Sequence, residues 1–328
     1  MEELTPISPR NSEASIARLD NVSFLHSGDR GIMQATLAVD RNSVLILLGP
    51  NGSGKSTILN LVAGFLTPQS GTVEVLNQRM NSSLRRHLGI LFQESSLDPL
   101  MTINETLSLH GKLFGMTNKD IRERTEILLN LTGLKDRRRE EIETLSGGLK
   151  RRLELARTVF HNPKLILLDE PTLGLDPEAK SAIWSTLTEI NSTGSTLIVA
   201  TNDVSEAERY GQTIVFLEKG RIVTQGTPYE LKRNLKRNSV RIEWPSAPKE
   251  IVKEISEWNG VGHVTGQPSD LHITVDDASV FIPTLFQSGY GSGILSIHVH
   301  ESTLEDAYFQ CVGSPLLPSP EQISSGKS

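Results

Sequence analysis

Short apolar runs and longer stretches with helical periodicity alternate along most of the chain. Three runs are apolar throughout: 44–48, 165–168 and 197–200. Such runs are typical of strands that are buried on both faces of a parallel sheet. Helical periodicity covers four segments around them: 56–63, most of 100–132, 147–160 and 178–190. The alternation predicts an α/β domain whose helices connect successive strands.

The pattern restarts after a polar, basic segment near 232–238, which indicates a linker between two domains. Beyond it we predict strand, helix, strand, strand, helix, strand and helix, which is the order of a small α+β split-βαβ domain. Ser302 and Glu305 have the spacing of a capping box at the last helix. The predicted boundaries are a disordered leader at 1–15, a large domain at 16–234, an accessory domain at 235–312 and a disordered tail at 313–328.

The loop after the first apolar run matches the phosphate-binding pattern of Gly, four residues, Gly-Lys and Ser or Thr. Its residues are Gly49, Pro50, Asn51, Gly52, Ser53, Gly54, Lys55, Ser56 and Thr57. Glycines let backbone N–H groups approach phosphate oxygens, and the start of the following helix adds partial positive charge. We expect Lys55 to be the only cation placed to reach the β- and γ-phosphates, and the Ser56 hydroxyl to bind Mg²⁺. Because strand, loop and helix follow in order, the pattern predicts a nucleoside triphosphate site.

Two polar motifs follow the phosphate loop. Leu145-Ser146-Gly147-Gly148 opens a predicted helix, and the apolar strand 165–168 delivers Asp169 and Glu170 at its carboxyl end. Ligand-binding residues of open α/β sheets lie at that end of the strands. Taken alone, the first motif is an ordinary helix cap and the two acids are a solvated strand end.

Their order together with the phosphate loop makes residues 17–232 resemble the nucleotide-binding domain of ATP-binding-cassette (ABC) proteins. The resemblance implies an α/β P-loop NTPase cassette with a helical subdomain, followed by the small split-βαβ domain. Gln93 resembles the family's glutamine-loop residue, and Leu173-Gly174-Leu175-Asp176 resembles its D-loop, which makes Asp176 a nucleotide-site candidate.

The resemblance also implies roles for the motif residues. Asp169 would hold Mg²⁺, Gln93 would contact Mg²⁺ or the attacking water, and Glu170 would be the general base for that water. Ser146 and the N–H groups of Gly147 and Gly148 would bind the γ-phosphate of ATP held by another subunit. The implied working unit is a head-to-tail dimer, homo- or heterodimeric, around two ATP molecules.

Three positions depart from the family pattern. Leu149 stands where a glutamine often follows Leu-Ser-Gly-Gly, a variation that we expect to be tolerated. His26 stands where the family places an aromatic ring on adenine; imidazole could stack there, or His26 could be an exposed loop residue. Asn202 replaces the switch histidine, and no histidine lies between His161 and His263 to take its place. Asn is neutral at all pH values and cannot shuttle a proton, which predicts slower hydrolysis with ATP binding retained. Asn202 is therefore a candidate catalytic residue.

The end of the second domain, residues 294–309, resembles the C-terminal extension of ATPase subunits of bacterial drug-resistance exporters. This implies a motor subunit that docks on separate integral membrane permease subunits at the cytoplasmic face of the membrane. The family docks its membrane partner on the segment that corresponds to 97–109. The alternative for that segment is ordinary core of the helical subdomain.

Composition narrows the function classes. The net charge of −6 and the pI near 5.8 argue against a general nucleic-acid partner. The single cysteine, Cys311, excludes an internal disulfide framework and suits a reducing compartment. No apolar run approaches the roughly 20 residues that span a bilayer.

Two other function classes stay open. One is a soluble cassette factor that works without a transporter. Translation factors of the family usually carry two cassettes, whereas this sequence shows one. The chain between Gly54 and Ser146 is too short for the coiled coil of a chromosome ATPase. A cluster-assembly factor is disfavoured by the second domain. A slowly hydrolysing, nucleotide-dependent regulator is the other class, because of Asn202.

Overall fold

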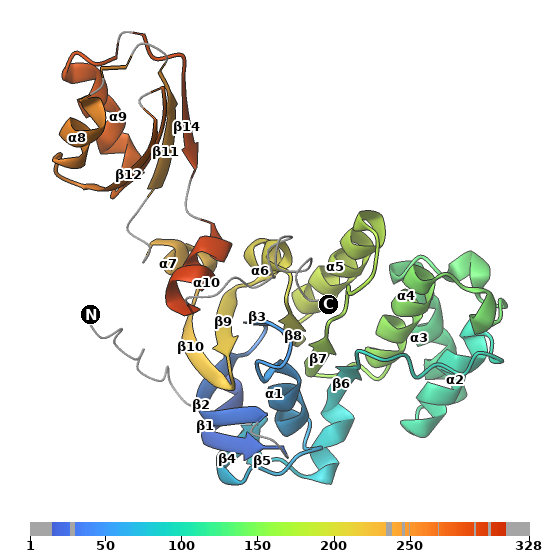
Figure 1. The fold of residues 1–328 in the computed structure, drawn as a ribbon. Helices are drawn as coiled ribbons and strands as arrows, with labels where there is room; N and C mark the ends of the chain where they lie inside the picture. The colour runs from blue at the N-terminus through green and yellow to red at the C-terminus, as the bar shows by residue number, and fades with distance from the viewer. Residues whose placement is uncertain are drawn as a thin grey trace, which may run out of the picture. The chain divides into compact units, whose positions relative to one another are not determined.

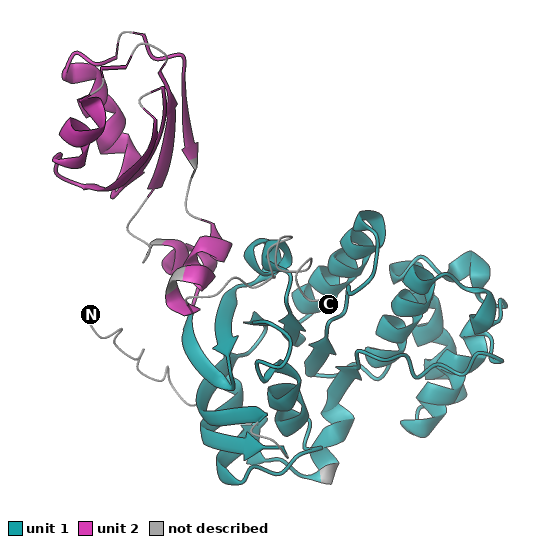
Figure 2. Cartoon of the chain, viewed as in Figure 1, with its two compact units in different colours: residues 1–225 teal, residues 226–328 magenta. Residues whose placement is uncertain are grey.

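The computed structural model describes residues 15–26, 30–233, 238–244, 247–248, 250–267, 269–291, 293–300 and 303–312. The chain divides into two compact units, residues 1–225 and 226–328 (Figure 2). Of the predicted leader at 1–15 only Ser15 is described, and the predicted tail at 313–328 lies outside the described residues. None of the described helices combines the length and apolar character needed to cross a bilayer.

The first unit contains two sheets (Figure 1). The smaller has the order β2-β1-β4-β5, with β1 (Ser15–Leu25), β2 (Gly31–Asp40), β4 (Ser70–Val75) and β5 (Gln78–Arg79). The larger has the order β10-β9-β3-β8-β7-β6, with β3 (Val44–Leu48), β6 (Leu88–Leu91), β7 (Leu165–Asp169), β8 (Thr196–Thr201), β9 (Thr213–Glu218) and β10 (Arg221–Gly226). From β9 to β6 the neighbouring strands of the larger sheet are parallel, and every residue of β3 and β8 is buried. Their apolar character follows from this burial on both faces.

The helices of this unit are α1 (Lys55–Val62), α2 (Ile103–Leu113), α3 (Asn118–Leu131), α4 (Gly147–Thr158), α5 (Pro177–Ser192) and α6 (Val204–Tyr210). The unit also contains three 3₁₀ turns: η1 (Ser82–His87) lies between β5 and β6, and η2 (Lys135–Arg137) and η3 (Ile142–Thr144) lie between α3 and α4. Helix α2 packs against α3 and α4, and these three helices form the helical subdomain (Figure 1). A capping box of Thr102 and Glu105 starts α2.

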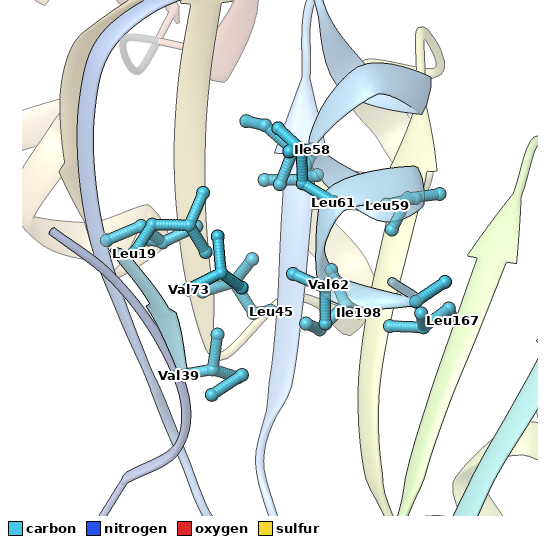
Figure 3. Close-up of a cluster of buried hydrophobic side chains, with 14 of the residues drawn as sticks. Leu19, Val39, Leu45, Ile58, Leu59, Leu61, Val62, Val73, Leu167 and Ile198 are labelled. Atoms are coloured by element: carbon cyan, nitrogen blue, oxygen red, sulfur yellow. The ribbon is translucent and has the colours of Figure 1, made fainter. Parts of the chain in front are cut away.

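Helix α1 is packed between the two sheets. It contacts β2 and β4 of the smaller sheet and β7 and β8 of the larger one. Ile58, Leu61 and Val62 are almost fully buried in the core that both sheets share (Figure 3). Burying a side chain of this size contributes about 1.5–3 kcal/mol. The core therefore fixes the start of α1, and with it Lys55, beside the carboxyl end of β3.

The second unit holds a four-stranded antiparallel sheet in the order β12-β13-β11-β14. Its elements are α7 (Pro228–Arg233), β11 (Asn238–Glu243), α8 (Ile251–Ser256), β12 (Val261–Gln267), β13 (Asp270–Val275), α9 (Ala278–Gln287), β14 (Ser296–His300) and α10 (Leu304–Val312). Helix α8 packs on β12 and α9 packs on β11, over a core that includes Trp244, Phe281 and Leu285. This is the predicted split-βαβ order, so both parts of the predicted fold class are confirmed.

Two details differ from the sequence-based expectation. The cap of α10 is Thr303 with Asp306, because the Thr303 Oγ1 accepts from the Asp306 N–H at 3.1 Å and the Asp306 Oδ2 accepts from the Thr303 N–H at 2.9 Å. The predicted Ser302–Glu305 box was one residue out, since two overlapping stretches share the same spacing; Ser302 lies outside the described residues. The unit boundary falls after Gln225 and not after Asn234, because α7 packs against α10.

Candidate active site

The phosphate-binding loop connects the buried strand β3 to α1. Gly52 and Gly54 have φ values of 83° and 106°, which only glycine adopts without strain. Gly54 is also crowded, since a Cβ there would lie 2.8 Å from the Gly31 carbonyl oxygen. The loop can therefore keep this shape only with glycine at these two positions.

A cavity of about 320 Å³ opens beside this loop. Most of the predicted site residues line it, and they come from the start of α1 and from segments that follow β1, β3, β6, β7 and β8. The lining residues are His26, Arg30, Gly31, Asn51, Gly52, Gly54, Lys55, Ser56, Thr57, Gln93, Asp169, Glu170, Leu173 and Asn202. Gly49, Pro50 and Ser53 belong to the loop but are not part of this lining. The structure thus brings the phosphate loop, the two acids, the glutamine and the switch position to one place, which we call the phosphate pocket.

Lys55 and Glu170 meet inside the phosphate pocket. Their Nζ and Oε1 atoms are 3.5 Å apart, and the two residues are only 5% and 7% exposed. The Lys55 ammonium also donates to the carbonyl oxygens of Gly49 at 2.7 Å and Pro50 at 3.2 Å. Burial lowers the pKa of Lys55 and raises the pKa of Glu170, although each charge opposes the shift of the other.

Glu170 is held in an unusual backbone conformation. Its φ of 46° lies in the left-handed region, which costs a non-glycine residue about 1–3 kcal/mol. Its backbone N–H donates to the Ala200 carbonyl oxygen on β8 at 2.9 Å. Within the described residues, its buried Oε1 is held only by the ion pair with the Lys55 ammonium, at 3.5 Å. A strained backbone and a buried, charged carboxylate are features of a residue placed for chemistry and not for packing.

The neighbouring pocket residues have fewer interactions. Asp169 ends β7, and Gln93 is exposed two residues past the end of β6. Asn202 follows β8, and its backbone hydrogen-bonds the Glu170 carboxylate. The His26 ring is edge-on to Phe24 with ring centroids 4.8 Å apart, and its Nε2 lies 3.5 Å from the Thr57 hydroxyl.

The signature residues and Asp176 lie around a different cavity of about 350 Å³, which we call the signature pocket. Ser146 caps α4, and its hydroxyl accepts from the Leu149 N–H at 3.4 Å. The Asp176 carboxylate caps α5 by accepting from the Ala179 N–H at 2.9 Å. The N-terminus of α4 thus faces this pocket with Gly147 and Gly148, which favours an anion, whereas the carboxylates of Asp176 and Glu178 line its other side.

Sequence reasoning missed cations in both pockets. Arg30 also lines the phosphate pocket, a second cation that the sequence analysis did not place there. Arg152 lines the signature pocket. Arg30 precedes β2 and is remote from every motif in the sequence, and Arg152 lies in a run of three basic residues that suggests only a solvated helix face. Their placement depends on the tertiary fold.

The oxygen ligands of the phosphate pocket fit a magnesium ion. Ser56, Gln93 and Asp169 all line it and present hydroxyl, amide and carboxylate oxygens, the donors that Mg²⁺ prefers. Among the described residues no three His, Cys, Asp or Glu side chains form a metal cage. The three residues would supply part of a coordination shell, which nucleotide phosphates commonly share.

Comparison with known proteins assigns the family. Residues 32–173 match the family model described as ABC transporter. The chain is 31% identical over 298 residues to the daunorubicin/doxorubicin resistance ATP-binding protein DrrA of Streptomyces peucetius, covering 89% of this chain and 90% of that protein. The chain belongs to the ABC transporter family. Its predicted resemblance to drug-resistance-type exporter subunits is thereby confirmed.

Two further comparisons agree with this assignment. This ABC protein is 36% identical over 221 residues to the Nod factor export ATP-binding protein I of Cupriavidus metallidurans, covering 66% of this chain and 73% of that protein. The solved structure of the ATP-binding cassette MJ0796, a dimer in a post-hydrolysis state bound to ADP and Pi, matches with a TM-score of 0.58 at 27% identity. That match covers 64% of this chain and 98% of that chain. The chain is an ATP-binding ABC ATPase.

Proposed function

We propose that this chain is the motor subunit of an ABC exporter, in which two ATPase subunits pair head-to-tail around two ATP molecules. Each ATP lies in the phosphate pocket of one chain and is closed by the signature pocket of the other. ATP hydrolysis then drives separate permease subunits in the membrane.

The separation of the two pockets carries this proposal. The phosphate loop, Asp169 and Glu170 line one cavity, whereas Ser146, Gly147 and Gly148 line another in the same unit. Neither lining contains residues of the other motif. A complete site for the γ-phosphate therefore needs the signature pocket of a second chain, and the dimeric cassette MJ0796 supports this arrangement. The second chain can be another copy of this chain or a different cassette.

The roles of the pocket residues follow from their positions. The N–H groups of the loop and the Lys55 ammonium bind the phosphates, and the ammonium exchanges the carbonyls of Gly49 and Pro50 for phosphate oxygens. Ser56, Asp169 and Gln93 would hold Mg²⁺, which neutralises charge on the β- and γ-phosphates. Glu170 accepts a proton from the attacking water, and the raised pKa of its carboxyl makes it a better base.

A band of exposed apolar side chains supports docking on a membrane subunit. Leu100, Leu109, Leu113 and Phe114 of the helical subdomain are 75%, 46%, 75% and 38% exposed, whereas Ile103 and Leu107 on the same segment are buried. Within 97–109, Ile103 and Leu107 thus form core, as one of the two sequence-based alternatives expected, whereas the exposed Leu100 and Leu109 are available to the proposed partner. Such docking places the chain at the cytoplasmic face of the membrane. The export direction is inferred from the printed functions of its relatives.

We also propose that Asn202 slows hydrolysis. Asn202 lines the phosphate pocket where a histidine was expected, and its amide can donate one neutral hydrogen bond to the γ-phosphate. A protonated imidazole would donate a stronger, charge-assisted bond. The chain is therefore a motor with low turnover, which would also suit a nucleotide-dependent regulator.

The test is Glu170→Gln, which removes the base and keeps the shape of the side chain. With ATP and Mg²⁺, size-exclusion chromatography should show a stable dimer and no phosphate release, while the parent returns to monomer after turnover. Glu189→Gln makes the same chemical change at an exposed position on α5 and should behave like the parent. Parental hydrolysis by Glu170→Gln would show that Glu170 is not the base.

A further inference from the structure

Arg151 of α4 makes a dense set of hydrogen bonds that no motif predicts. Its guanidinium donates to the carbonyl oxygens of Phe92 at 2.8 Å, Asp169 at 3.1 Å, Glu170 at 2.9 Å and Pro171 at 2.7 Å. Its Nη1 also donates to the Glu154 carboxylate at 2.9 Å. One side chain of α4 thus binds the backbone of residues 169–171, which we call the catalytic turn, and the backbone of Phe92.

Arg151 and Glu154 form a buried ion pair, and burying two charges needs an explanation. Arg151 and Glu154 are only 8% and 3% exposed. A buried ion pair of this kind often adds little net stability compared with apolar residues of similar volume. The planar fork of arginine, however, can hold several carbonyl groups in a fixed mutual arrangement, which an apolar residue cannot do.

The backbone that Arg151 holds carries the two residues nearest the proposed chemistry. Three of its four carbonyl acceptors belong to Asp169, Glu170 and Pro171, and Glu170 has the strained φ of 46°. The fourth belongs to Phe92, immediately before Gln93. Strained conformations persist only where neighbouring interactions over-determine them. Arg151 supplies such interactions on the carbonyl side of Glu170.

The C-terminal part of α4 also hydrogen-bonds the segment that contains Gln93. Arg157 of α4 donates to the Ser96 carbonyl oxygen at 3.0 Å and to the Ser96 hydroxyl at 2.6 Å. The glutamine segment 92–96 is therefore attached to α4 at both of its ends. Ser146, which begins the same helix, lies only five residues before Arg151, or roughly 7 Å along the helix axis.

We infer that Arg151 is a positioning residue that couples the signature pocket to the catalytic turn of the same chain. A displacement of α4 when its N-terminus binds the partner's nucleotide is passed through the guanidinium to Glu170 and Gln93, which act on the chain's own nucleotide. The inference rests on the proposed role of Glu170 and on the proposed dimer. It gives each chain a physical link between the two ATP sites.

The experiment measures kcat, KM and the Kd of a fluorescent ATP analogue for the full chain and its Arg151 variants. Arg151→Met should lower kcat by about ten- to a hundredfold, because displacing a catalytic group by about 1 Å can cost a factor of 10². The Kd should change by less than about twofold, since Arg151 does not line the phosphate pocket. The Hill coefficient for ATP should fall towards one, because the link between the sites is cut. Arg151→Lys keeps the charge but not the fork, so its kcat should lie between the two.

Two further variants keep the test decisive. Arg151→Met leaves Glu154 buried without the Arg151 guanidinium, so the double variant with Glu154→Leu removes both charges and should fold, which its melting curve checks. Arg124→Met is the matched control, because Arg124 donates to the Val159 and Phe160 carbonyl oxygens at the far end of α4, at 2.9 and 3.1 Å. It should lower thermal stability and leave kcat and the Hill coefficient unchanged.

The outcomes separate the inference from the proposed function. If Glu170→Gln abolishes hydrolysis while the folded double variant keeps the parental kcat and Hill coefficient, the coupling role of Arg151 is rejected. An equal loss of kcat in Arg124→Met and Arg151→Met would also reject it, because general packing of α4 would then explain both. If Glu170→Gln itself hydrolyses at the parental rate, the proposed base fails, and a selective loss of cooperativity in Arg151→Met still supports the link.

Discussion

One ion pair from each unit shows that the closer of two pairs is not the one with the stronger effect. The pairs compared are Arg241–Asp270 and Lys55–Glu170. Arg241 and Asp270 of the second unit form a bidentate pair at 2.9 Å for both contacts, with side chains 40% and 42% exposed. Lys55 and Glu170 of the first unit are 3.5 Å apart and almost fully buried. The closer pair is in contact with water, which screens it and competes for its hydrogen bonds. Burial, and not the distance between the charges, therefore decides which pair has the stronger electrostatic interaction.

The pKa values of the two carboxyl groups shift in opposite directions because Asp270 is in contact with water and Glu170 is buried. Hydrogen bonding by Arg241 lowers the pKa of Asp270, so its stabilising contribution is present above its ordinary pKa and is lost as the pH falls. Burial raises the pKa of Glu170, so the native state binds more protons than the unfolded chain. The contribution of Glu170 to stability therefore declines as the pH rises above its ordinary value of 4.5. The surface pair favours folding with both charges present, whereas the pocket pair lowers stability and supplies reactivity.

The strongest test of this contrast removes the buried cation. Lys55→Ala should abolish measurable ATP binding, with at least about a hundredfold rise in Kd, because two charge-assisted hydrogen bonds to phosphate are lost. Titration with a fluorescent ATP analogue measures this, and Lys119→Ala on the surface of α3 is the control. Unchanged affinity would mean that Arg30 or the loop N–H groups suffice, and the assignment of Lys55 would fail.

A change at the switch position should act on rate and not on binding. Asn202→His should raise the ATPase rate by roughly one to two orders of magnitude, since it restores a contact of about 1.5–3 kcal/mol to the γ-phosphate. It should also add an inflection near pH 6.5, the ordinary pKa of histidine, that the parent lacks. Steady-state rates decide this, with Asn118→His on the exposed start of α3 as control. A rate equal to or below that of the parent would show that Asn202 does not limit the motor.

Removing the second unit should change the phosphate pocket very little. A chain ending at Gln225 should bind the ATP analogue with a Kd within about twofold of the parent, because each unit has its own core. A chain ending at Asn234 keeps α7 without α10, which covers it, and should be the less soluble of the two. Loss of ATP binding in both truncations would contradict the proposed boundary between independent domains.

The smallest effect is expected at the surface pair. Arg241→Ala should leave the melting temperature and the ATPase rate unchanged within the precision of measurement, despite the bidentate geometry. Differential scanning calorimetry at low and high salt provides the readout. A clear loss of stability that persists at high salt would show that this pair is more shielded from water than its exposure indicates.

The sequence was sufficient for the elements that obey local rules. Apolar runs in the sequence predict the buried parallel strands. Gly52, Gly54 and Lys55 belong to a motif that lies between a predicted strand and a predicted helix, so the phosphate loop was also predictable. Local rules fail where overlapping signals compete, as at the cap of α10, where Ser302 and Thr303 offer the same spacing. They also fail where a side chain acts at long range. Arg151 stands in a basic run that looks solvated, and its acceptors at Phe92 and Glu170 are brought to it only by the fold.

The placement of the phosphate loop and the signature in different pockets of one chain has a genetic consequence. In a dimer of the proposed kind, each ATP site draws half of its parts from either copy. Two alleles that are each inactive, one altered at Lys55 and the other at Ser146, would concentrate both defects in one site when paired. The second site would then be assembled entirely from intact halves, so co-expressing the two alleles would restore activity that neither shows alone.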